Sequence, residues 1–318
     1  MTLTKKFNGT FGLFIVIVAF LYACGPTSVQ TDQTKLTEIY PKAVLTMNKG
    51  IKWYNKGCYQ KAVQFFWDAN EQFSAVDLPE GVAASFNSIG NANHHLGEMD
   101  EAVLFLNQSL RIYEQLDDRK RQIKTLSDIA AAYLTAENID RAGVLIERGE
   151  KIAQKWNINE LGLSLTKGIW LTRKKKYDQA RNVLQSALDL VDSNDMVTLG
   201  TINRALGQLE LQVGHLDRAR QFFEVALDAD RQSIFYRGIA DNLAELGQLH
   251  VRQKRLSKGL FYLQRSIKVY ALLGDKAHVT QLWSQIKPLA DSVGRDLRLT
   301  IGLTNRWLEG DAHFSLCK

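Results

Sequence analysis

Two stretches with the same layout decide the fold: GNANHHLGEMDEA at residues 90–102 and GQLELQVGHLDRA at residues 207–219. Each opens on a glycine, has a second glycine seven residues later and ends on an alanine five residues after that. A frame that returns at two distant places is the mark of an internal repeat, which has to be traced before any single segment is assigned a structure.

The frame occurs six times, at intervals of 38 to 40 residues. A small residue opens each copy: Gly50, Gly90, Ala130, Gly168, Gly207 and Gly247. Twelve residues later comes a second small residue: Ala62, Ala102, Ala142, Ala180, Ala219 and Gly259. An apolar residue follows four positions on: Phe66, Leu106, Ile146, Leu184, Phe223 and Leu263. A third small residue comes three positions further: Ala69, Ser109, Gly149, Ala187, Ala226 and Ser266.

Spacings of four and three place these last three columns on one face of a helix, so each copy predicts a pair of helices. The small side chains let neighbouring helices approach, and we expect the larger Phe or Leu to fill the space between successive units. Glycine marks the turn inside three units, at Gly57, Gly97 and Gly214, where a helix end favours the left-handed conformation. The other three turns must form without glycine.

The pattern resembles the tetratricopeptide repeat, whose second helix carries a run of the form Ala-x-x-x-aromatic-x-x-Ala, as in ARQFFEVA at residues 219–226. The likeness extends over roughly residues 44–272, and the long units are similar to the long-repeat subtype. The proline that often closes a repeat is largely missing, and units 3, 4 and 6 are degenerate. The resemblance implies an all-α fold: a solenoid of about six stacked helix pairs in residues 41–275, wound into a right-handed superhelix.

Residues 276–318 should close the array, since a solenoid needs a capping element at its end. The apolar stripe Val279, Leu282, Trp283, Ile286 and Leu289 predicts a capping helix. Pro288 is expected to bend or end this helix. A final helix through Trp307 and a tail follow.

The first 23 residues are read as a secretory leader, because Lys5 and Lys6 precede an uncharged apolar run from Phe11 to Ala23. That run is shorter than the roughly 20 residues needed to cross a bilayer. An uncleaved signal anchor is the alternative. Removing the leader lowers the formal charge from +6 to 38 − 34 = +4, which specifies no partner.

The sequence Leu21-Tyr22-Ala23-Cys24 is similar to the lipobox of bacterial lipoproteins. This resemblance implies that Cys24 becomes a lipidated N-terminus, that residues 24–40 are a tether, and that Gly25 directs the protein to the outer membrane, facing the periplasm. Several acyl chains anchor a protein firmly, whereas one binds only marginally.

In the tetratricopeptide family the first helix of each unit lines a concave groove, which implies candidate binding residues here: Asn87, Asn91, His94, Lys124, Arg204 and Gln208. Asn87 and Asn91, one helical turn apart, could bond a peptide backbone, and Arg204 could pair with an acidic group. The alternative is that these three residues are merely solvated.

The basic run and the two remaining cysteines say less about function than the repeat does. The basic run Arg173–Lys176 falls at an expected turn and has no interleaved aromatic residues, which favours a solvated loop over a nucleic-acid contact. Export would permit a disulfide between Cys58 and Cys317. Two unpaired thiols are the favoured interpretation, because the ends of a solenoid are usually far apart.

The sequence contains no pattern typical of catalysis or of a cofactor. The histidines lie outside HExxH spacing, and GxGxxG, GxxxxGK[ST] and GxSxG are absent from the sequence. We therefore expect no enzymatic activity, cofactor or metal. The favoured function is a membrane-anchored scaffold that binds a protein or peptide in its groove. A cytosolic, peptide-responsive regulator and an enzyme with a dispersed site are the alternatives.

Overall fold

The computed structural model describes residues 41–312 and 316–317, and within them the regular secondary structure is all α-helix. The predicted leader, Cys24 and the tether lie outside the described residues. Six helix pairs follow one another: α2 (Pro41–Asn55) with α3 (Tyr59–Ala75), α4 (Pro79–Leu96) with α5 (Met99–Gln115), α6 (Arg119–Thr135) with α7 (Ile139–Trp156), α8 (Leu161–Arg173) with α9 (Tyr177–Asp189), α10 (Met196–Val213) with α11 (Leu216–Gln232), and α12 (Tyr236–Arg252) with α13 (Leu256–Leu273).

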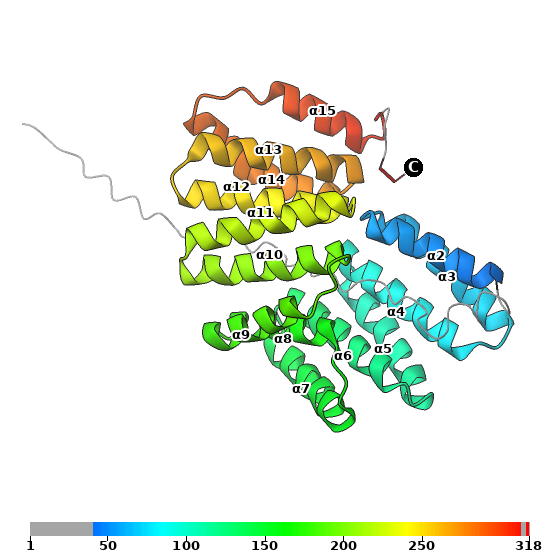
Figure 1. The fold of residues 1–318 in the computed structure, drawn as a ribbon. Coiled ribbons are helices and arrows are strands. Elements are labelled where there is room, and N and C mark those ends of the chain that lie inside the picture. The colour runs from blue at the N-terminus through cyan, green and yellow to red at the C-terminus, as the bar shows by residue number, and fades with distance from the viewer. Residues whose placement is uncertain (1–40, 313–315, 318) are drawn as a thin grey trace, which may run out of the picture.

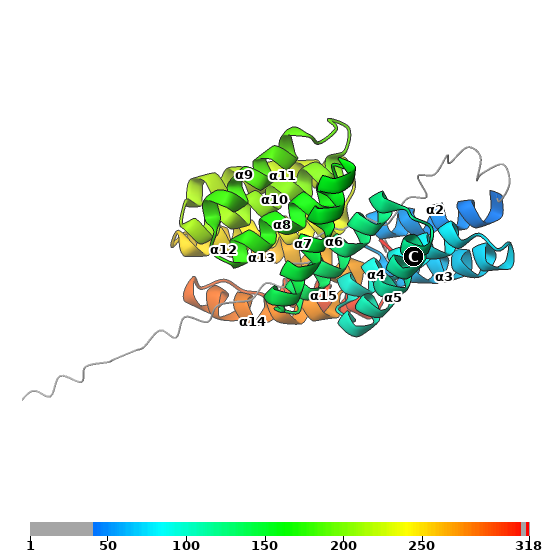
Figure 2. The ribbon, with the colours of Figure 1, turned by 90° about the horizontal axis from the view of Figure 1, so that it is seen from below.

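The pairs stack in chain order into the solenoid that the resemblance implied (Figure 1). The sixth pair is closed by α14 (Lys276–Ser292) and α15 (Arg298–Leu308), both of which pack on α13 (Figure 2). Pro288 was expected to bend or end the capping helix. It does not end the helix, because α14 continues past Pro288 to Ser292. Proline has no backbone N–H to donate, but Pro288 lies only four residues before the last residue of α14, so the helix loses one hydrogen bond near its end and is not interrupted.

A close contact between small and large residues holds each pair together. A Cβ atom added to the first small residue would meet the apolar residue sixteen positions later: at Gly90 it would lie 2.6 Å from Leu106 Cγ, and at Gly207 it would lie 2.6 Å from Phe223 Cε1. The same contact recurs at Gly50, Gly168 and Gly247. The large residue therefore fills the space inside a hairpin, because glycine brings the two helix axes of one pair together. It also packs between successive units as expected, since Leu106 clusters with Leu126 and Ile129 of the next unit.

The turn inside each pair has the same geometry with or without glycine. Glu137, Lys175 and Lys254 adopt φ values of 59°, 59° and 60°, in the left-handed region that Gly57, Gly97 and Gly214 also occupy. In each turn the next N–H donates to the carbonyl five residues back, as Asn138 N does to Tyr133 O at 2.8 Å. This hydrogen bond satisfies a helix-end carbonyl and offsets part of the strain of a non-glycine residue.

We expect Gly90→Ala to destabilise the protein, although alanine is the better helix former by about 1 kcal/mol. The new methyl group would press on Leu106 Cγ and lie 3.0 Å from the Ala102 carbonyl oxygen, and overpacking of this kind costs about 1–3 kcal/mol. Gly302→Ala is the matched control, since nothing lies within 4 Å of its added Cβ in α15. Thermal unfolding should show a lower Tm for the first variant and an unchanged or higher Tm for the second. Equal shifts would contradict the packing role of the glycine column.

Candidate functional site: the inner helical layer

The first helix of every pair belongs to an inner layer. In α10 all residues from Gly200 to Leu211 are buried, whereas its partner α11 buries only one face. Helices α4, α6 and α12 are buried nearly all round in the same way. Because these helices also carry many polar side chains, the buried polar groups must find partners within the layer.

Between α4 and α6 the shared partner is Asp128, which is 1% exposed. Its Oδ2 accepts hydrogen bonds from Asn87 Nδ2 at 2.8 Å and from Asn91 Nδ2 at 3.0 Å. Lys124 Nζ lies 3.2 Å from the same oxygen, one helical turn away on α6. The two asparagines are thus used to join neighbouring units.

Other polar contacts continue the layer in both directions. His94 Nε2 lies 2.8 Å from Thr135 Oγ1, again between α4 and α6, and Ser127 Oγ lies 2.9 Å from Thr166 Oγ1 between α6 and α8. Burial lowers the pKa of His94 to about 4, so this histidine is neutral at pH 7.

The C-terminal half of the layer is more strongly charged. Gln208 Nε2 donates to Glu245 Oε1 at 2.8 Å, and Arg204 pairs with Asp241 at 3.4 Å, both between α10 and α12. Burial raises the pKa of Glu245. The candidate residues Arg204 and Gln208, like Asn87 and Asn91, therefore bond across to the next unit.

Arg237, at the start of α12, is the most connected group of this half. Its side chain is 3% exposed and donates to Asp241 Oδ1 at 3.0 Å and to Asp275 Oδ2 at 2.7 Å. Burial alone would lower the pKa of Arg237, but the neighbouring Asp241 and the other anionic groups raise it, so the guanidinium stays charged. For Asp275 burial opposes ionisation, yet hydrogen bonding to His278 and the charge of Arg237 lower its pKa to about 2.

The two ends of the array meet at Arg237. A Cβ added to Gly57, in the turn between α2 and α3, would lie 2.9 Å from Arg237 Cβ. The superhelix has therefore completed a turn, and the first hairpin touches the sixth (Figure 1). We call this contact the seam, and define it by Gly57, Cys58, Tyr59 and His95 on one side and Arg237 on the other.

The seam holds buried polar atoms without hydrogen-bond partners among the described residues. The ring of His95 stacks on Tyr59 at a centroid distance of 4.5 Å, and neither of its nitrogens is bonded. The hydroxyl of Tyr59 is likewise buried and unbonded. Burial lowers the pKa of His95 well below its usual value. Electrostatic repulsion from the nearby His94, Arg237 and Arg204 lowers it further. Burial also raises the pKa of Tyr59. Such atoms carry an uncompensated desolvation cost.

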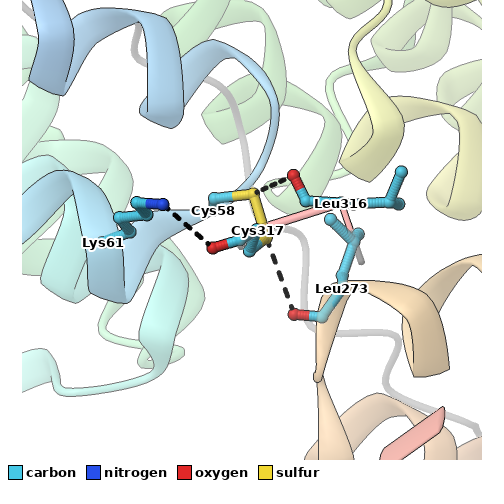
Figure 3. Close-up of a disulfide and its surroundings, with 5 residues drawn as sticks. All are labelled: Cys58, Lys61, Leu273, Leu316 and Cys317. Atoms are coloured by element: carbon cyan, nitrogen blue, oxygen red, sulfur yellow. Dashed lines mark hydrogen bonds between the residues drawn. A yellow bond between two sulfur atoms is a disulfide. The ribbon is translucent and has the colours of Figure 1, made fainter. Parts of the chain in front are cut away.

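A disulfide between Cys58 and Cys317 fastens the seam (Figure 3). The prediction of two unpaired thiols is wrong, because the superhelix returns the first turn to the chain end and brings the two Cα atoms within 5.4 Å. Lys61 Nζ donates to the Cys317 carbonyl oxygen at 3.4 Å, and Cys317 Sγ lies 4.0 Å from the Leu273 carbonyl oxygen at the end of α13.

Five of the six predicted groove residues are buried side chains that bond within the layer; only Lys124 is partly exposed, with 24% of its side chain accessible. The prediction that these six residues face the groove missed their partners in the layer: Asp128, Thr135, Asp241 and Glu245. It also missed the buried pair of Arg237 and Asp275. One signal could have found them, since partners such as Arg204 and Asp241 or Arg237 and Asp275 lie 37 and 38 residues apart, about one repeat.

Three other kinds of site were considered: a nucleic-acid contact at the basic run, a metal site and a membrane span. The basic run lies in the turn between α8 and α9, where Lys174–Lys176 are exposed and Lys174 Nζ is 3.8 Å from Asp140. Across residues 41–312 and 316–317 there is no group of three or more His, Cys, Asp or Glu side chains placed to hold a metal ion. None of the helices in that part of the chain combines the length and hydropathy that a bilayer crossing requires.

Comparisons with known proteins agree with this architecture. Residues 81–155 match the family model of the tetratricopeptide repeat. A sequence search of curated proteins finds no match.

Solved structures extend the likeness over most of the chain. The structure of NprR in complex with its cognate peptide NprX is 12% identical, with a TM-score of 0.57 over 88% of this chain and 86% of that one. The APC/C heterotetramer Cut9–Hcn1 is 15% identical, with a TM-score of 0.55 over 81% of this chain and 45% of that one. The apo form of RapI is 14% identical, with a TM-score of 0.50 over 85% and 96%. This chain therefore spans less than half of the Cut9–Hcn1 chain. The fold is that of a tetratricopeptide-repeat solenoid.

We expect Asp128→Ala to lower the free energy of unfolding by about 3 kcal/mol, because it removes the buried carboxylate that Asn87, Asn91 and Lys124 share. Asp178→Ala is the control, since that carboxylate is 95% exposed beside Arg181 and should matter little. Urea unfolding followed by circular dichroism measures both variants. Comparable losses from the two substitutions would show that the inner polar contacts do not stabilise the stack.

Proposed function

We propose that this chain is a non-catalytic scaffold that binds a protein or peptide partner through the inner layer of its superhelix. The observation that carries the proposal is the layer itself: polar groups from successive units line it, and several buried ones at the seam have no hydrogen-bond partner among the described residues. A bound peptide backbone supplies the donors and acceptors that such groups lack. The similarity to NprR in complex with its cognate peptide NprX supports the same class of ligand.

We further propose that the chain works at the bacterial cell envelope, anchored through lipid on Cys24, on the outer membrane and facing the periplasm. The leader pattern in residues 1–24 motivates the anchor. The Cys58–Cys317 disulfide supports an oxidising compartment, because structural disulfides persist in the periplasm and are rare in the bacterial cytosol.

A peptide-responsive regulator in the cytosol is the second candidate. It is favoured by the likeness to NprR with NprX, and to apo RapI, over more than four fifths of this chain. Cell fractionation separates the two candidates. Recovery in the membrane fraction with lipid on Cys24 supports the scaffold, and soluble cytosolic recovery with an intact leader supports the regulator.

The binding function is tested by crosslinking in cells. A photoreactive amino acid at position 124 samples the inner layer, where Lys124 is the accessible candidate, and one at position 217 samples the outer surface, where the side chain of Asp217 is 84% exposed on α11. We expect a discrete crosslinked partner from position 124 and not from position 217, identified by mass spectrometry. Absence of any adduct at 124 in both oxidised and reduced cells, or the same adduct at both positions, would contradict binding through the inner layer.

A further inference from the structure

The seam differs from every other contact in the array, because it joins units that are remote in sequence. Helices α2 and α3 pack extensively on each other and on α4, as a terminal hairpin of a stack must. Their link to the sixth unit runs instead through one turn, in which Gly57 lies against Arg237 and Cys58 is bonded to Cys317 (Figure 3). A covalent bond thus closes a junction that has little helix packing of its own.

Cys317, near the chain end, contacts both the first and the sixth helix pair. The Cys317 carbonyl accepts from Lys61 of the first hairpin, and Lys61 Nζ also lies 3.8 Å above the ring of Trp53. On the other side Cys317 Sγ lies against the end of α13 at Leu273. The tail therefore bridges the first and sixth units, and the disulfide fixes the bridge.

Breaking that bond removes the only covalent tie across the seam in the part of the chain that the structure describes. The atoms left at the opened junction would be those that lack partners now, the Tyr59 hydroxyl and both ring nitrogens of His95, together with the charged Arg237. Hydration or a ligand would satisfy them, so opening recovers the desolvation cost that the closed seam carries.

We propose that the Cys58–Cys317 disulfide is a redox latch that keeps the inner layer closed, and that its reduction opens the seam and exposes this layer to a partner. The inference rests on the proposed function, since it supplies the regulation of the same binding layer.

The chemistry requires a dithiol reductant. One of its thiolates attacks Sγ of Cys317, because Cys317 is the more exposed of the two residues and Cys58 is only 3% exposed, and the Cys58 thiolate leaves. The second thiol of the reductant then displaces Cys317 from the mixed disulfide. The reductant ends as a disulfide, and the two electrons and two protons that it loses convert the Cys58–Cys317 disulfide into two thiols.

Histidine labelling of the full chain with diethyl pyrocarbonate tests the latch without a known partner. Labelling is compared between the oxidised protein, the protein reduced with dithiothreitol, and the double variant Cys58→Ser, Cys317→Ser, which has no latch thiols to react. We expect modification of His95, now 4% exposed, to rise at least about fivefold in the reduced protein and in the variant. Mass spectrometry of digested peptides measures it.

Two histidines serve as internal controls. His215, with 49% of its side chain exposed, should react equally in all three samples, and His250, buried between α12 and α13 beside Tyr262, should stay protected. Circular dichroism checks that the helical content is retained. Unchanged protection of His95 would overturn the latch, because packing alone would then hold the seam. A parallel rise at His95 and His250 would also overturn it, since the disulfide would then stabilise the whole array.

Crosslinking from position 124 in oxidised and in reduced cells tests whether opening of the seam increases binding of a partner to the inner layer. A higher yield after reduction supports the latch as a regulator, and an equal yield overturns that role. If no adduct forms in either state while His95 labelling still rises, the proposed function fails and the opening of the seam stands.

Discussion

The structure depends on one contact, repeated in nearly every hairpin: a glycine of the first helix against a large apolar side chain of the second. Without a Cβ at Gly90 or Gly207, the two helices approach until Leu106 or Phe223 fills the space between them. This approach fixes the shape of each unit, and identical units can only stack with a constant rotation. The curvature of the superhelix follows from that rotation, accumulated over six pairs.

Curvature has a second consequence, because it forces the first helices together on the inner side. Four of them, α4, α6, α10 and α12, are buried nearly all round, although their sequences include Asn, Asp, Arg and Glu. The layer is therefore held by hydrogen-bonded pairs such as Asn91 with Asp128 and Gln208 with Glu245, each of which links one unit to the next. A ligand that enters this layer must replace hydrogen bonds with equivalent ones, which favours a peptide backbone over an apolar molecule.

The sequence was sufficient to predict the parts of the fold that depend on local spacing. The six units, their turns and the capping helix follow from residues within one repeat of each other, and even the glycine-free turns at Glu137, Lys175 and Lys254 keep the expected conformation. The polar pairs of the inner layer were missed because each residue was considered alone, although opposite charges one repeat apart were visible in Arg237 and Asp275.

The seam could not be predicted in this way. Whether Cys58 meets Cys317 depends on the total rotation of the stack, and a small error in each unit, summed over six units, moves the ends apart by many ångströms. The rotation per unit is set by side-chain packing, which no spacing rule supplies. For the same reason the sequence did not identify Tyr59 and His95 as neighbours of Arg237.

The claim on which this description of the molecule depends is that six stacked units bring the first turn back to the chain end. Peptide mapping of the purified full chain tests it most directly, by blocking free thiols with an alkylating agent, digesting without reduction and sequencing the fragments by mass spectrometry. A fragment pair that contains Cys58 joined to Cys317 is the expected result. Separate peptides with both cysteines alkylated would contradict the closed superhelix.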